Sequence, residues 1–193
     1  MSYNNFLFKG IFDLFKKYRY RLFKGYLNVN IFAVRNPNRR SNKFDDHIYI
    51  FYQDKRSNWI LRSYPVTTCP GYTSLTNPIN PKGTAVLVPG QYRGSHKLGK
   101  HRGRYLALVQ KRKVKVYRDN NLDGKCDYDQ NTIEEGYFGI NIHKAGGDSL
   151  VVNNWSAGCI VFKKAHHFYD FLNICKQSAK IYGNSFTFTL FQG

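Results

Sequence analysis

The sequence of 193 residues has no apolar run of about 18 residues, the length that a membrane-spanning helix requires. Its first residues, MSYNNFLFKGIFDLF, lack the charged start, apolar stretch and small-residue cleavage site of a secretory signal peptide. We therefore expect synthesis in the cytoplasm without a signal peptide, followed by delivery through other means if the protein works outside it. No internal repeat or low-complexity linker interrupts the chain, so one domain with a short appendage is expected.

Cysteine is scarce, and its spacing assigns no metal site. The chain has four cysteines, Cys69, Cys126, Cys159 and Cys175, and no C-x-x-C pair. Paired cysteine spacing is the sequence sign of a zinc site, so that class of site is not indicated. No disulfide framework can be assigned from these positions either, and a chain of this length does not need one to fold.

Acidic residues are few, with 12 Asp and Glu against 30 Lys and Arg. Residues 1–43 contain ten basic residues and one acid, Asp13, while residues 93–118 contain ten basic residues and no acid. These two blocks predict two basic surfaces. Either the surfaces bind an anionic partner, or they only keep the protein soluble. Helix-turn-helix, zinc and RNA-binding signatures are all missing, so nucleic acid is an unlikely partner.

Apolar residues recur at helical spacing between Phe8 and Leu22, with lysines and arginines between them and Gly25 as the expected stop. The pattern predicts a basic amphipathic helix, which places an appendage at residues 1–27 and a β-rich domain at residues 28–193. Such a helix can lie on a membrane surface, bind a partner or fold back on its own domain. Docking on the domain or on a partner is the favoured interpretation.

From Asn28 onward the apolar period changes to two, which predicts strands. The segments with this pattern are NVNIFAV, HIYIFYQ, WILRSYP, TAVLVPG, YLALVQ, VKVYRD and SFTFTLF. Near the end, apolar positions from Phe168 to Tyr182 predict a helix that ends at Gly183. The pattern therefore predicts a mainly β domain with a C-terminal helix packed on the sheet.

One histidine precedes a cysteine in the stretch GINIHKAGGDSLVVNNWSAGCIVF. GINIH predicts a strand that ends at His143, and SAGC predicts a turn that delivers Cys159 into the strand CIVF. A nucleophilic thiol needs a base and donors for the oxyanion, and the amides around Gly158 and Cys159 are candidates for those donors. Spacing alone leaves the alternative open that Cys159 is a small buried residue.

The pattern of IH, a loop and then S-x-G-C before an apolar strand resembles the active-site signature of the L,D-transpeptidase family, which has the YkuD-like fold. Further blocks resemble a branch of this family that is common in bacteriophage genomes, and together they span residues 29–192. These blocks are NKFDDHIYIFYQD, YPVTTCPGYTSLTNPINPKGTAVLVPGQYRG, LGKHRGRYLALVQ, VYRDNNLD, GYFGINIHKAG and WSAGCIVF.

The resemblance implies a β-rich, sandwich-like domain with a Cys-His site that acts on peptidoglycan stem peptides through a thioester. It assigns Cys159 as the nucleophile and His143 as the base. Ser156 and Gly158 match the turn before the nucleophile, and the amides of Gly158 and Cys159 match the oxyanion site. The reaction it implies is peptide hydrolysis or L,D-transpeptidation. A phage origin further implies a virion-associated protein, with residues 1–27 contacting other virion proteins or the bacterial envelope.

The chain departs from the family pattern at three positions. Ala157 stands where many members have a histidine, and Val161 stands where many have an arginine. Cys69 stands in TTCPG, where TTDPG is expected, so Cys69 is either incidental or a redox partner of Cys159. The departures support an alternative function, in which a virion structural or cargo protein retains the fold as a binding module.

Two further groups of residues are candidates for binding. His101, Arg102 and Arg104 in LGKHRGRY, together with Trp155, are expected to contact anionic groups of the substrate, although a basic surface strand explains the first three equally well. The stretch DNNLDGKCD has the oxygen-ligand spacing of a calcium loop. Its candidate Ca²⁺ ligands are Asp119, Asn121, Asp123 and Asp127. A polar turn accounts for the same residues, and no cofactor is required.

Overall fold

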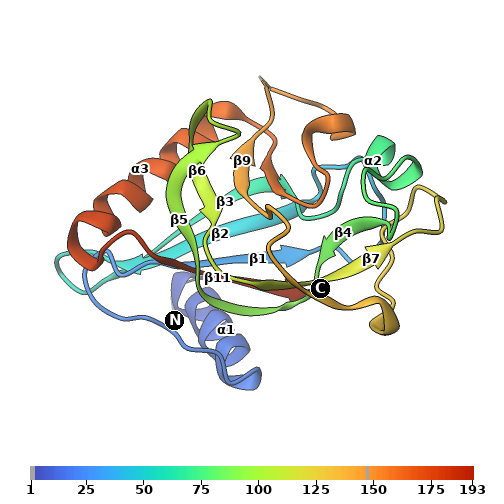
Figure 1. Ribbon diagram of the computed structural model, residues 1–193. Coiled ribbons are helices and arrows are strands. Elements are labelled where there is room, and N and C mark those ends of the chain that lie inside the picture. The colour runs from blue at the N-terminus through green and yellow to red at the C-terminus, as the bar shows by residue number, and fades with distance from the viewer. Residues whose placement is uncertain (1–2, 147) are drawn as a thin grey trace.

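The computed structural model describes residues 3–146 and 148–193. The helices are α1 (Tyr3–Lys17), α2 (Tyr72–Thr76) and α3 (Ala165–Tyr182), with short 3₁₀ turns η1 (Gln130–Thr132) and η2 (Asn153–Trp155). The strands are β1 (Asn30–Arg35), β2 (Asp46–Gln53), β3 (Trp59–Thr67), β4 (Thr84–Leu87), β5 (Gly90–His101), β6 (Tyr105–Gln110), β7 (Val114–Asp119), β8 (Glu134–Gly136), β9 (Ile142–Lys144), β10 (Ile160–Phe162) and β11 (Phe186–Gln192). The mainly β fold with a helix at each end is confirmed (Figure 1).

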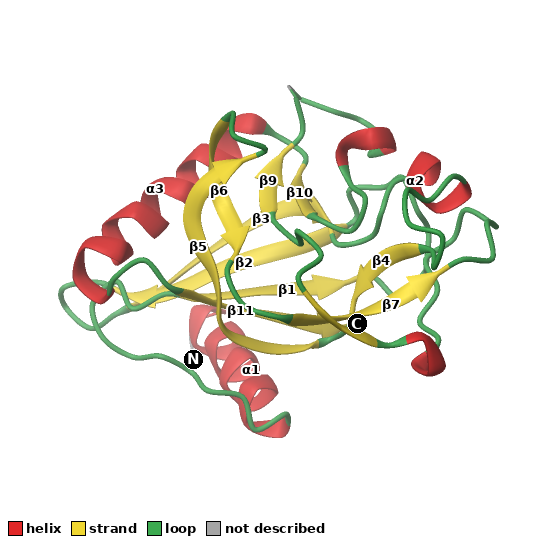
Figure 2. Ribbon diagram, in the orientation of Figure 1, coloured by secondary structure: helices red, strands yellow, loops and turns green. Residues whose placement is uncertain are grey.

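The strands form one large sheet and one small sheet, as Figure 2 shows in yellow. The large sheet has the order β1-β11-β5-β6-β9-β10-β3-β2 and closes on itself, and β4-β7-β8 form the second sheet. The large sheet is therefore closed, unlike the two open, stacked sheets of the sandwich-like fold that the resemblance implies. Most neighbours are antiparallel, but β1 pairs with β11 in parallel and β9 pairs with β10 in parallel.

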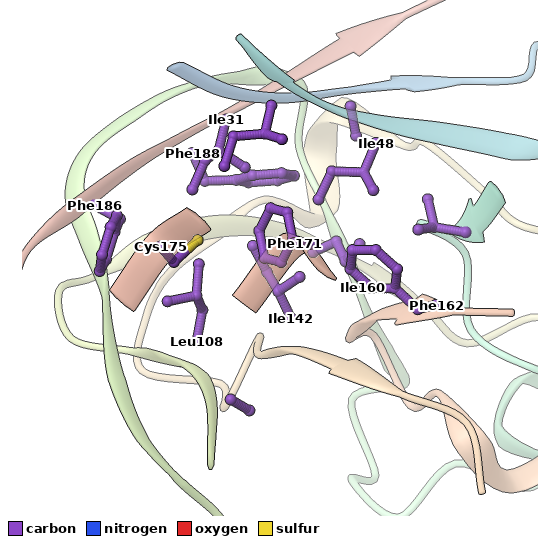
Figure 3. Close-up of a cluster of buried hydrophobic side chains, with 14 of the residues drawn as sticks. Ile31, Ile48, Leu108, Ile142, Ile160, Phe162, Phe171, Cys175, Phe186 and Phe188 are labelled. Carbon is purple, nitrogen blue, oxygen red and sulfur yellow. The ribbon is translucent and has the colours of Figure 1, made fainter. Parts of the chain in front are cut away.

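The main core lies between the large sheet and α3. One face of α3 is buried through Phe168, Phe171, Leu172, Ile174 and Cys175, and this face joins the apolar cluster of the strands (Figure 3). Helix α3 ends at Gly183, as the sequence predicts, because the residue there has a φ of 81° that favours glycine. The helix begins at Ala165, one turn earlier than its apolar period indicates.

Helix α1 covers a second apolar face of the same sheet. Successive residues of a strand point to opposite faces, so Ile31 enters the main core while Phe32 faces α1. Phe15 of α1 packs edge-on against Phe32 and Phe191, with ring centroids 5.6 and 5.4 Å away. The basic helix therefore folds back on its own domain, and its exposed side carries the lysines.

The helix is shorter than predicted. It ends at Lys17, and Arg19 adopts a φ of 55°, which is outside the helical range. Tyr18 and Tyr20 then stack on each other and contact Phe191, so aromatic packing on the sheet replaces the next helical turn. None of the helices in the described residues is both apolar and long enough to cross a membrane.

Candidate active site

Strands β9 and β10 bring His143 and Cys159 to the same part of the sheet. They pair in parallel, with Ile160 beside Ile142 and Val161 beside His143. The pairing continues one residue further back, where the Ile160 amide donates to the Asn141 carbonyl over 2.9 Å. Cys159 therefore lies directly before β10, beside Asn141.

The alternation of the two strands points both side chains to one face. Ile142, Ile160 and Phe162 are fully buried in the main core. Since neighbouring residues of a strand face opposite sides, Cys159 and His143 lie on the side that faces away from this core. Because Ile142 and Ile160 point into the core, the adjacent side chains of His143 and Cys159 must point to the other face of the sheet.

Hydrogen bonds fix the tautomer of His143. Its Nδ1 lies 2.9 Å from the Lys144 carbonyl oxygen and 3.3 Å from the Tyr105 hydroxyl. A carbonyl oxygen only accepts, so Nδ1 carries the hydrogen of the neutral ring. The other nitrogen, Nε2, then has a lone pair, which is the form that a general base needs.

A second histidine supports the first. The ring of His101 stacks on that of His143 with centroids 4.1 Å apart and planes 21° apart. His101 Nδ1 lies 3.1 Å from the Asn141 amide nitrogen, which donates to it, and the Asn141 side-chain oxygen accepts from the Gln110 amide over 2.8 Å. Asn141 therefore orients His101, and His101 packs against the predicted base.

Burial keeps the imidazole and the thiol uncharged at neutral pH. Burial, followed by the charges of His101 and Arg102, lowers the pKa of His143 to about 4. Burial raises the pKa of the Cys159 thiol, while a backbone hydrogen bond from Asn141 and the charge of Arg102 act in the opposite direction. The resting pair is therefore a neutral thiol and a neutral imidazole, so sulfur must lose its proton during the attack.

The turn before Cys159 is held by Ser156. The buried Ser156 hydroxyl donates to the Cys159 carbonyl over 2.8 Å and accepts from the Gly158 amide over 3.2 Å. Gly158 has a φ of 122°, and a Cβ there would lie 2.4 Å from the Ala85 carbonyl oxygen. Only glycine fits this position.

The two predicted oxyanion donors differ in their state. The Gly158 amide already donates to Ser156, while the Cys159 amide has no hydrogen-bond partner among the described residues. The Cys159 thiol donates to the Gly139 carbonyl over 3.3 Å and is half-buried. The Cys159 amide is therefore the donor that is free to bind a developing oxyanion.

A cavity of about 270 Å³ opens beside His143. All of the expected substrate contacts line this cavity with His143, namely His101, Arg102, Arg104 and Trp155. Two further lining residues, Tyr105 and Asn154, were not singled out from the sequence. Arg102 lies at the tip of the β5–β6 hairpin with a φ of 49°. Its guanidinium and that of Arg104 give the cavity a positive rim.

No family model, curated protein or solved structure matches this chain.

The two substituted positions of the motif face different surroundings. Ala157 lines a second hollow of about 430 Å³, which also contains Ile79, Tyr137 and Phe138. Val161 is fully buried. The turn from Trp155 to Cys159 thus separates two hollows, with Trp155 in the first and Ala157 in the second.

The alternative in which Cys69 pairs with Cys159 is wrong, because Cys69 forms a disulfide with Cys126 and Cys159 is a free thiol. The disulfide supports the turn from a distance. The segment after Cys69 holds the Ser156 carbonyl through the Gly71 amide, over 2.9 Å, and the Ser74 hydroxyl, over 3.0 Å.

The candidate calcium loop forms a network of internal hydrogen bonds. Asp119 accepts from the Asp127 amide over 2.8 Å, and Asp123 accepts from the Lys125 amide over 2.8 Å. Asp127 also forms an ion pair with Arg39 and accepts from Asn121. Across residues 3–146 and 148–193, no three His, Cys, Asp or Glu side chains are grouped as metal ligands. Calcium binding stays a prediction.

Proposed function

We propose that the protein is a YkuD-like cysteine enzyme that cleaves or exchanges peptidoglycan stem peptides, with Cys159 as nucleophile and His143 as general base. The observation that carries the proposal is the shared face of β9 and β10. That face carries a half-buried thiol and a neutral imidazole whose Nε2 has no hydrogen-bond partner among the described residues, and the cavity with the positive rim opens beside His143.

The proposed reaction has two steps. His143 Nε2 accepts the thiol proton while the Cys159 sulfur bonds to the peptide carbonyl carbon, and the Cys159 amide stabilises the oxyanion. The carbon–nitrogen bond then breaks, and the proton on Nε2 goes to the leaving amine. Attack by water on the thioester completes hydrolysis, whereas attack by a second amine completes transpeptidation; either one restores the thiol.

Purified protein incubated with peptidoglycan tests this function, with released or exchanged stem peptides followed by mass spectrometry. We expect products that disappear in Cys159→Ala and in His143→Gln. Cys175→Ala is the matched control, because it removes the other free thiol, which is buried in the core. The reaction should be run without reductant so that the Cys69–Cys126 disulfide stays closed. Products that persist in Cys159→Ala contradict the proposal.

A second candidate is a virion structural or cargo protein that uses the fold as a binding module. The observation that favours it is the resting state of the thiol, whose raised pKa and bond to the Gly139 carbonyl do not promote nucleophilic attack. Iodoacetamide labelling separates the two. An enzyme labels at Cys159 at a rate that falls in His143→Gln, whereas a binding module labels slowly in both.

Virion association and contact with the envelope belong to the same proposal. The apolar face of α1 is used on its own sheet, so residues 8–27 of this segment offer mainly their exposed basic side chains to such partners.

A further inference from the structure

Another cavity shares no described lining residue with the cavity beside His143, and no step of the proposed reaction uses it. It has a volume of about 660 Å³ and is formed where the segment after α1, the first half of β5, the end of α3 and the start of β11 meet. In Figure 1 this is the end of the molecule where α3 finishes and the chain turns into β11. Cavities of this size hold small organic molecules.

The two basic blocks of the sequence meet at this cavity. Arg21 of the first block lies beside Gln91, two residues before the second block, because the Arg21 amide donates to the Gln91 side chain and the Gln91 side chain donates back to the Arg21 carbonyl, each over 2.8 Å. Phe23 lines the cavity from the first block, and Arg93 and Arg112 line it from the second. The basic side chains that line the cavity, Arg93 and Arg112, both come from the second block.

A bulge in the sheet directs polar groups into the cavity. The register between β5 and β11 shifts between Phe186 and Phe188, so residues 93–95 lie opposite Thr187 alone. The bulge contains Gly94, with a φ of 59°, whose amide donates to the Thr187 hydroxyl over 3.2 Å. Bulges redirect side chains, and here the bulge follows directly on Arg93.

The Ser185 hydroxyl and the Arg112 guanidinium lie close together beside Gly94, which has no side chain to separate them. A Cβ at Gly94 would lie 3.1 Å from the Ser185 hydroxyl and 3.5 Å from the central carbon of the Arg112 guanidinium. Arg93 and Arg112 are exposed, and neither forms an ion pair with another described residue. The described lining residues include no Asp or Glu. Two guanidinium groups with hydroxyl donors and no nearby acid match the chemistry of a phosphate group.

We propose that this cavity binds a phosphate ester. Arg93 and Arg112 hold the phosphate, Ser185 donates to it, and the organic part of the ligand lies against Phe23 and Phe186. The source of the phosphate is either a free small-molecule ester or the headgroup of an anionic lipid. The proposal does not depend on Cys159.

Isothermal titration with sn-glycerol 3-phosphate at constant ionic strength tests the free ester, and sedimentation with phosphatidylglycerol vesicles, against phosphatidylcholine vesicles, tests the headgroup. We expect binding in at least one arm, weakened more than about tenfold in Arg93→Gln/Arg112→Gln, because the double variant loses both charged donors to the phosphate. Binding in the first arm identifies a free ester, and binding to vesicles alone identifies a lipid headgroup.

The matched control is Arg56→Gln/Lys176→Gln, which removes two exposed charges outside the cavity. It should bind like the wild type, as should Cys159→Ala. All four exposed residues can change without loss of folding, which an unchanged melting temperature of the unliganded variants checks. Binding in neither arm, or equal weakening in the two double variants, overturns the proposal.

Discussion

The Cys69–Cys126 disulfide should account for a large part of the stability of this domain. The two cysteines are 57 residues apart in sequence, and the entropy of closing a loop of that length in the unfolded chain corresponds to about 4 kcal/mol. Reduction, or Cys69→Ser/Cys126→Ser, should lower the free energy of unfolding by about that amount. For a chain of this size the melting temperature should fall by about 10 °C.

Guanidinium unfolding followed by tryptophan fluorescence measures this effect, with and without a phosphine reductant. Cys159→Ala serves as the control, because it removes a free thiol and leaves the cross-link intact. Hydrogen exchange of the Gly71 amide should also accelerate on reduction, since that amide holds the Ser156 carbonyl. The reasoning is refuted if the oxidised and reduced proteins unfold at the same denaturant concentration.

Three further predictions concern His143, Phe15 and the acidic loop at residues 119–127. The pKa of His143 is lowered to about 4, so below pH 6.5 the unfolded state takes up a proton first. The stability difference between wild type and His143→Gln should therefore fall by about 1.4 kcal/mol per pH unit from pH 6.5 to about 4, and a constant difference refutes the assignment. Phe15→Ala should destabilise by about 3 kcal/mol in urea unfolding, while exposed Lys16→Ala should not; equal effects would mean that α1 is not part of the core. One oxygen of Asp119 and one of Asp123 already accept backbone amides, and Asp127 is paired with Arg39, so Ca²⁺ should raise the melting temperature no more than Mg²⁺; a Ca²⁺-specific rise that is lost in Asp123→Asn would show a metal site.

The strands with regular alternation could be predicted, because each buries one face. DHIYIFYQ is an example, and its predicted boundaries differ from the structure by a few residues at most. Strand β5 was not predicted as a whole, since GQYRGSHKLGKH is rich in basic residues and glycine and its bulge breaks the alternation. The early end of α1 was also missed, because aromatic packing on Phe191 comes from a strand more than 150 residues away.

The site could be predicted only in part. The motifs IH and SAGC predict His143 and Cys159 as site residues, and the structure places both side chains on the same face of the sheet. The contributions of Tyr105 and Gly139 depend on tertiary contacts that leave no local pattern. Asn141 is different, because the alternation in GINIH already places it on the face of His143. The Cys69–Cys126 bond joins two loops whose approach is set by the small sheet, which sequence spacing does not reveal.

The most direct test of the central claim is the mass of the protein after incubation with a stem-peptide donor and rapid quenching in acid. The account predicts an acyl group bound to the peptide that contains Cys159, removable by hydroxylamine as a thioester and not formed in Cys159→Ala. Formation should also slow strongly in His143→Gln. An unmodified Cys159 at every time point, with the Cys69–Cys126 disulfide intact, would contradict the account.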